Sequence, residues 1–116
     1  MPMALVEKQI TRSELAELAK ERFGDLIKAV VDVERGIMTI GGELHADEEA
    51  LLLDQGSRQQ DLWGINLYPD KSGDDFVEFD SMINLRPSQG NRSRDVHDPV
   101  IRQKIRDIVN QLVETA

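Results

Sequence analysis

The chain has 116 residues, with 14 Lys and Arg against 22 Asp and Glu, a formal net charge of -8 and no cysteine. This length predicts a single domain over residues 1–116, and the lack of cysteine excludes disulfides, thiolate catalysis and cysteine-ligated metal centres. An acidic chain with 3 Phe, 1 Trp and 1 Tyr also argues against a nucleic-acid partner. No apolar run approaches the roughly 18 residues of a membrane-spanning helix, and the first ten residues do not resemble a signal peptide. We therefore expect a soluble, cytoplasmic protein with no membrane partner.

The first predicted helix covers residues 12–23. Thr11 and Glu14 have the spacing of a capping box, in which each side chain satisfies a backbone N–H at the helix start. Gly24 suits the positive φ that often follows a helix. Residues 1–9, which precede this helix, are expected to form an edge strand or a flexible N-terminus.

Two strands and a second short element follow. Apolar and polar residues alternate over residues 26–34 and again over 37–44, and Gly36 between them favours a tight hairpin. Over residues 47–55, Asp47 is placed as a helix N-cap before two further carboxylates and three leucines, which predicts a two-turn helix. A short strand over 47–55 remains the alternative.

The second half of the chain predicts two more strands and a last helix. The strands cover residues 62–68 and 76–86, joined by an acidic loop. Asp98 as N-cap and Pro99 at the first helical position begin a helix whose apolar residues recur at helical spacing over 101–113.

The resulting order, α-β-β-α-β-β-α, predicts the α+β class. We expect a two-layer sandwich in which a four- to five-stranded, mainly antiparallel sheet carries two to three helices on one face and a polar, open surface on the other.

One candidate site lies between the second strand and the second helix. If the strand extends to Asp47, the side chains of Glu43, His45 and Asp47 share a face, and such residues can ligate a divalent cation or act as a general acid and base. The simpler interpretation is that Asp47 caps a helix while Glu43 and His45 are solvated. On this interpretation, which we favour, the protein has no cofactor.

A second candidate site is the arginine-rich segment 84–94, just ahead of the last helix. Residues 1–80 carry 8 basic and 18 acidic groups, whereas residues 81–116 carry 6 and 4. The candidate donors for an anion are Asn84, Arg86, Gln89, Asn91, Arg92 and Arg94. The alternative is that these arginines form ion pairs with acidic residues of the same chain.

Four sequence runs carry a resemblance to a known family. They are KAVVDVE (28–34), GGELHAD (41–47), DLWGINLYP (61–69) and INLRPSQGNRS (83–93). Over about residues 10–113 the chain resembles a small family of uncharacterised prokaryotic proteins. The resemblance implies a protein of unknown function and supplies no activity, cofactor or catalytic residue.

These observations favour a non-enzymatic binding or interaction module, in which the arginine-rich segment holds an anionic small molecule or an acidic protein partner. One alternative is a small metal-dependent hydrolase that uses Glu43, His45 and Asp47. Another is a self-association module that forms a homodimer through an exposed sheet edge or the polar sheet face.

Overall fold

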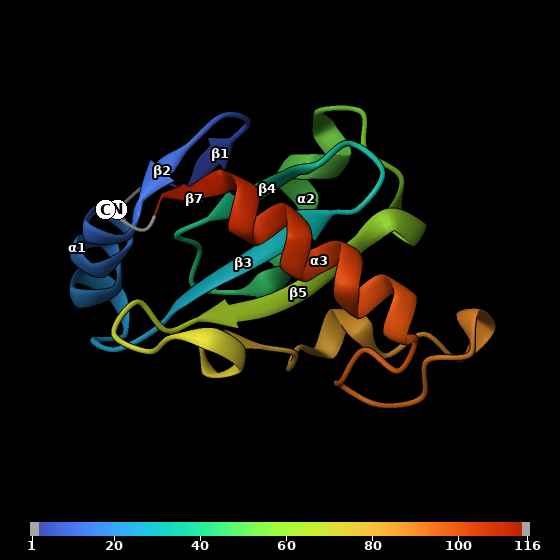
Figure 1. Ribbon diagram of the computed structural model, residues 1–116. Helices are drawn as coiled ribbons and strands as arrows, with labels where there is room; N and C mark the ends of the chain where they lie inside the picture. Colours follow the sequence, from blue (N-terminus) through green and yellow to red (C-terminus); the bar gives the residue numbers. More distant parts are fainter. Residues whose placement is uncertain (1–2, 115–116) are drawn as a thin grey trace.

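A five-stranded antiparallel sheet runs through the middle of the computed structural model, which describes residues 3–114 (Figure 1). Its strands follow the order β1-β4-β3-β5-β6. Their bounds are β1 Ala4–Val6, β3 Ile27–Asp32, β4 Ile37–Ile40, β5 Leu62–Leu67 and β6 Val77–Glu78. The helices are α1 Arg12–Arg22, α2 His45–Asp54 and α3 Pro99–Leu112. A small parallel pair, β2 (Ile10–Thr11) with β7 (Val113–Glu114), joins the segment before α1 to the segment after α3. The α+β class is confirmed, and an edge strand forms within the predicted N-terminal stretch.

Two helices begin at the caps that the sequence predicts. At α1, Thr11 Oγ1 accepts a hydrogen bond from the Glu14 amide at 3.0 Å, and Glu14 Oε1 accepts one from the Thr11 amide at 3.1 Å. At α3, Asp98 Oδ1 accepts from the Val100 amide at 2.8 Å, and Pro99 stands at the first helical position. These local bonds satisfy amide groups that have no partner inside the helix.

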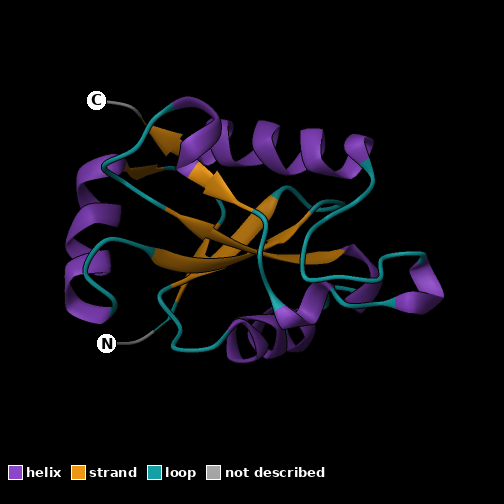
Figure 2. Ribbon diagram, turned by 90° about the horizontal axis from the view of Figure 1, so that it is seen from below, coloured by secondary structure: helices purple, strands orange, loops and turns teal. Residues whose placement is uncertain are grey.

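Two helices, α1 and α3, share one face of the sheet as predicted, whereas α2 lies on the other face, which the sequence predicts to be open (Figure 2). On one face, α1 and α3 cover the main core, to which β3 contributes Ala29 and Val31. On the other face, α2 covers a smaller apolar cluster that includes Val30 and Leu52. On this second side β3 carries Val30 between Lys28 and Asp32, and the apolar cluster around Val30 needs cover, so the face predicted to be polar and open is largely buried.

Helix α2 forms where the sequence predicts a helix rather than a strand, but it begins at His45, two residues early. Its N-cap is Leu44, and no side chain caps its first turn, so the predicted role of Asp47 as N-cap is wrong. The reason lies in tertiary contacts: His45 is bonded to the sheet, and the Gly42 amide donates to the carboxyl group of Glu48 at 3.1 Å. These contacts replace a side-chain cap.

The predicted strand over 76–86 is the other clear difference. Only Val77–Glu78 pairs with β5, and the chain then continues through two short 3₁₀ helices, η3 (Met82–Asn84) and η4 (Pro87–Gln89). The cause is Gly64 in β5, where an added Cβ atom would lie 2.5 Å from the Cβ of Ser81. The missing side chain lets the segment after β6 cross over the sheet face instead of following its edge.

Candidate functional site

The arginine-rich segment folds back on itself around buried amides. Asn91 Nδ2 donates to the backbone oxygen of Asn84 at 2.7 Å and to that of Asp95 at 2.6 Å, while its Oδ1 accepts from the His97 amide at 2.9 Å. Asn84 Nδ2 in turn donates to the backbone oxygen of Arg94 at 2.9 Å. The side chains of Asn84 and Asn91 are therefore occupied in holding the loop.

Arg86 is also occupied, in the interior of the protein. Its guanidinium group donates to three backbone oxygens, those of Gln59, Leu62 and Ile83. It lies 3.6 Å from Glu49 Oε2 and 4.7 Å from the centre of the Trp63 ring. Burial lowers the pKa of Arg86, and the nearby Glu49 carboxylate opposes that shift. This arginine ties together chain segments and does not face an open site.

Gln89 and Arg92, two further candidate donors for an anion, lie at the surface. Gln89 Nε2 donates to the backbone oxygen of Gln60 at 3.2 Å. Arg92 is exposed, and its side chain has no hydrogen bond or ion pair with any residue from 3 to 114. Of the three arginines in this segment, Arg92 and Arg94 thus present their guanidinium groups to solvent.

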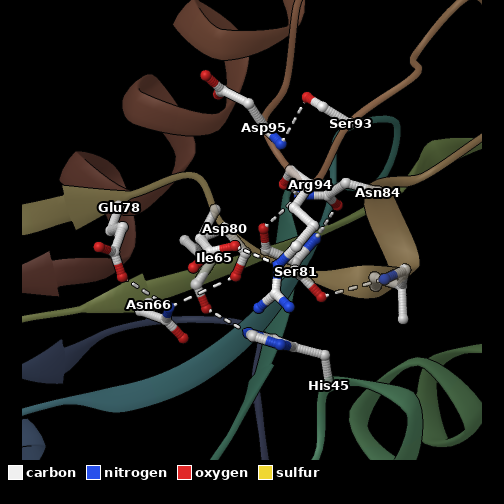
Figure 3. Close-up of polar contacts among 12 residues, drawn as sticks. His45, Ile65, Asn66, Glu78, Asp80, Ser81, Asn84, Ser93, Arg94 and Asp95 are labelled. Atoms are coloured by element: carbon white, nitrogen blue, oxygen red, sulfur yellow. Dashed lines mark hydrogen bonds and ion pairs between the residues drawn. The ribbon is translucent and has the colours of Figure 1, made fainter.

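Arg94 lies beside the start of α2 (Figure 3). Its Nε donates to Asp80 Oδ1 at 2.6 Å, and its side chain remains 55% exposed. The two terminal nitrogens have no partner within the described part of the chain, and in Figure 3 they point toward the ring of His45. His45, from one predicted site, and Arg94, from the other, are thereby brought close together.

His45 is the first residue of α2 and is nearly buried. Its Nε2 lies 2.8 Å from the backbone oxygen of Ile65, which can only accept, so Nε2 carries the proton. Burial lowers the pKa of His45, and the charges of Lys28 and Arg94 lower it further, against raising effects from the Ile65 bond and Asp80. The ring is therefore neutral at pH 7, with Nδ1 left as an acceptor.

The neighbouring strand ends supply further polar groups. Asn66 Nδ2 donates to Glu78 Oε1 at 2.9 Å, and the Tyr68 hydroxyl donates to the same oxygen at 3.0 Å. Desolvation, together with the Glu78 carboxylate, raises the pKa of Tyr68 to about 12. The buried Oδ1 of Asn66 has no partner among the described residues. We call the following six residues the polar cluster: Lys28, His45, Asn66, Glu78, Asp80 and Arg94.

The three predicted metal ligands do not converge. Glu43 Oε1 pairs with Arg22 Nη1 at 2.9 Å, and Glu43 and Asp47 line a hollow beside α2, whereas His45 reaches the backbone of β5. Within residues 3–114 no group of three His, Asp or Glu side chains is placed to hold a metal ion. This geometry does not favour the metal-dependent hydrolase.

The sheet also offers little to a second copy of the chain. Its two edges are the short strands β1, of 3 residues, and β6, of 2 residues. The face expected to be open is covered by α2. Short edge strands limit pairing between sheets, so self-association by either predicted route is not favoured.

Among known proteins, the chain is similar to one family. Searches of curated proteins and of solved structures gave no match. No helix in the part of the chain that the structure describes is both long and apolar enough to cross a membrane. One family, described as Protein of unknown function (DUF5674), matches residues 4–112. The chain belongs to this family, whose function is unknown.

Proposed function

We propose that the protein is a non-enzymatic binding module whose polar cluster holds a carboxylate or phosphate group, carried by a small molecule or by an acidic partner protein. One observation carries this proposal. Asp80 holds Arg94 by its Nε, so that the two terminal nitrogens of the guanidinium group extend over His45 without a partner among the described residues.

A guanidinium group held in this way is prepared to bind an anion. Arginine recognises carboxylates and phosphates with two parallel N–H donors, and less entropy is lost when its position is already fixed. The 2.6 Å bond to Asp80 supplies that fixed position, although about half of the Arg94 side chain is exposed. Arg92, in the same loop, has no such carboxylate to position it.

Lys28 gives the cluster a second cation. Its ammonium group lies 5.3 Å from the centre of the Phe23 ring and has no ion pair within residues 3–114. Lys28 lies opposite Asn66 in the pairing of β3 with β5, so the two side chains lie on the same face of the sheet. Lys28 and Arg94 thus give the polar cluster two cations beside its two carboxylates, those of Glu78 and Asp80.

The surrounding acids would make such a site selective. The net charge of -8 repels anions at long range, whereas the two cations act at contact, where salt screens them less. His45 supports a binding role, because its Nε2–H is occupied by a backbone carbonyl and not by a side-chain nucleophile.

The test uses inorganic phosphate, with binding followed by the ¹⁵N NMR shifts of the amides of His45 and Arg94. The Arg94→Gln variant should bind phosphate roughly tenfold more weakly, which corresponds to the loss of a charge-assisted hydrogen bond. Arg92→Gln is the matched control, because it removes an exposed arginine from the same loop, and it should change the dissociation constant less than twofold. Equal losses in both variants, or no saturable shift in the unmodified protein, would reject the polar cluster as an anion site.

A second titration separates the two sources of the anion. The peptide acetyl-Asp-Glu-Asp-Glu-amide should bind more tightly than phosphate if the natural ligand is an acidic protein segment. If phosphate binds more tightly than the peptide, a small anionic molecule is the ligand. In both cases the Arg94→Gln variant must show the larger loss.

A further inference from the structure

A second surface, separate from the polar cluster, lies on the other side of α2. It is an open hollow of about 830 Å³, to which the segment before β1 contributes Met3 and the turn after β4 contributes Gly42. Helix α2 contributes one stripe of side chains, Asp47, Ala50, Leu51 and Asp54. The hollow therefore combines an apolar middle with a carboxylate near each end of the stripe.

The two α2 carboxylates are available to a ligand. Asp47 and Asp54 have no ion pair or side-chain hydrogen bond among residues 3–114. They are seven positions apart in the chain, which places them about 10 Å apart along the helix axis. Glu43 and Arg22 also line the hollow, and they pair with one another, with Glu43 Oε1 2.9 Å from Arg22 Nη1, so neither is counted with the two α2 carboxylates.

A buried carboxyl group, that of Glu48, lies directly behind the wall of the hollow. Glu48 is fully buried, and its Oε1 has no hydrogen-bond partner in the described structure. A Cβ atom added to Gly42 would lie 2.8 Å from Glu48 Cγ and 3.1 Å from Met3 Sδ, and both Gly42 and Met3 line the hollow. Burial raises the pKa of this carboxyl group to about 9, so it is uncharged at neutral pH, and the negative charge that a ligand meets in the hollow is that of Asp47 and Asp54.

The charge of the chain selects the kind of occupant. Residues 1–80 carry 18 acidic and 8 basic groups, and a second copy of the chain would bring the same acidic stripe to the interface. Like charges facing one another cost free energy, and an anionic lipid surface or nucleic acid is disfavoured for the same reason. A cationic, partly apolar segment has no such penalty.

We propose that this hollow is the docking site for a basic segment of a partner protein, with arginine or lysine side chains at Asp47 and Asp54 and apolar groups against Ala50 and Leu51. The aliphatic stems of basic side chains can lie on the apolar middle while their charged ends reach the two carboxylates. This surface does not share residues with the polar cluster, so the two proposals stand or fall separately.

The test uses the peptide acetyl-Arg-Leu-Leu-Arg-amide as probe, titrated into ¹⁵N-labelled protein. Saturable shifts are expected at the amides of Gly42, Ala50 and Leu51. Neutralising both carboxylates, in Asp47→Asn/Asp54→Asn, should weaken binding roughly fivefold to tenfold, as two surface ion pairs are lost. A double variant with the same change in net charge, Asp70→Asn/Asp75→Asn in the exposed loop before β6, should change it less than twofold.

Four results would overturn the proposal. They are the absence of saturable shifts at the hollow, equal binding of the uncharged peptide acetyl-Gln-Leu-Leu-Gln-amide, equal losses in the two double variants, and the same shifts on concentrating the protein without peptide. The second would show an apolar site without charge selection, the third an effect of overall charge, and the fourth a homodimer. Supporting evidence requires selective binding of the arginine peptide together with a selective loss in the α2 variant.

Discussion

The side-chain amide of Asn84 is paired with the backbone of Gly64 on β5. Asn84 Oδ1 accepts from the Gly64 N–H at 2.8 Å, and Asn84 Nδ2 donates to the Gly64 oxygen at 2.9 Å. One side chain thus makes the two hydrogen bonds that a neighbouring strand would otherwise make to this residue. Arg94 depends on the same side chain, because its backbone oxygen accepts a third bond from Asn84 at 2.9 Å.

Replacing Asn84 by alanine should destabilise the protein by about 3 kcal/mol, because two buried backbone groups of Gly64 lose their partners. Urea unfolding followed by circular dichroism measures the change. The control is Asn110→Ala on the exposed side of α3, where no loss is expected since alanine favours a helix. If Asn84→Ala loses no more stability than the control, the Asn84 side chain does not replace a strand.

Gly64 should tolerate no larger residue while Ser81 lies against it. In Gly64→Ala the new Cβ would meet Ser81 Cβ and Oγ, each at 2.5 Å, so about 1–3 kcal/mol of stability should be lost through overpacking. The double variant Gly64→Ala/Ser81→Gly should recover part of the loss in the same unfolding assay. If Ser81→Gly and Gly64→Ala are strictly additive, the close contact between them is not the cause.

The elements that form as predicted are those whose determinants lie close together in the chain. The capping box of Thr11 and Glu14 and the Asp98–Pro99 helix start are both decided within three residues, and both form as predicted. The alternation along β3 likewise depends only on neighbouring residues. Elements of this kind are readable because the interacting groups are close in the chain.

The failures have long-range causes. The strand expected over 76–86 is replaced by a crossing segment because Asn84 finds its partner at Gly64, 20 residues earlier, and nothing near either residue marks the pair. The apolar character of Val30 could have indicated that the second sheet face is covered. The approach of Arg94 to His45 depends on that crossing. Both residues could be singled out from the sequence, but their closeness in space could not.

Glu48 should make the protein less stable as pH rises. Burial raises the pKa of its carboxyl group from 4.5 to about 9, partly offset by the Gly42 amide bond. Between these values the folded state holds a proton that the unfolded state has lost, so the free energy of unfolding falls by about 1.4 kcal/mol per pH unit. Glu48→Gln, which resembles the protonated acid, should abolish this slope and be more stable at pH 8.

Urea unfolding at several pH values between 4.5 and 9 tests this prediction. The matched control is Glu21→Gln on the exposed surface of α1, which should retain the slope of the unmodified protein. An unchanged slope in Glu48→Gln would show that Glu48 is ionised in the folded protein and that its partner is still to be found.

His45 should produce a slope of the opposite sign at lower pH. Its folded pKa lies below the ordinary 6.5, chiefly because of burial, so on acidification the unfolded state takes up a proton before the folded state does. This contribution to stability is therefore fully present above pH 6.5 and is lost as the pH falls through the folded pKa.

Between pH 4.5 and 6.5 this loss is masked by Glu48, whose effect on stability has the opposite sign. In the Glu48→Gln background the His45 slope should emerge, and His45→Gln should remove it, whereas the exposed control His97→Gln should not. If the slope persists in the Glu48→Gln/His45→Gln double variant, another group takes up the proton. The description of His45 as a neutral ring bonded to the Ile65 carbonyl would then be wrong.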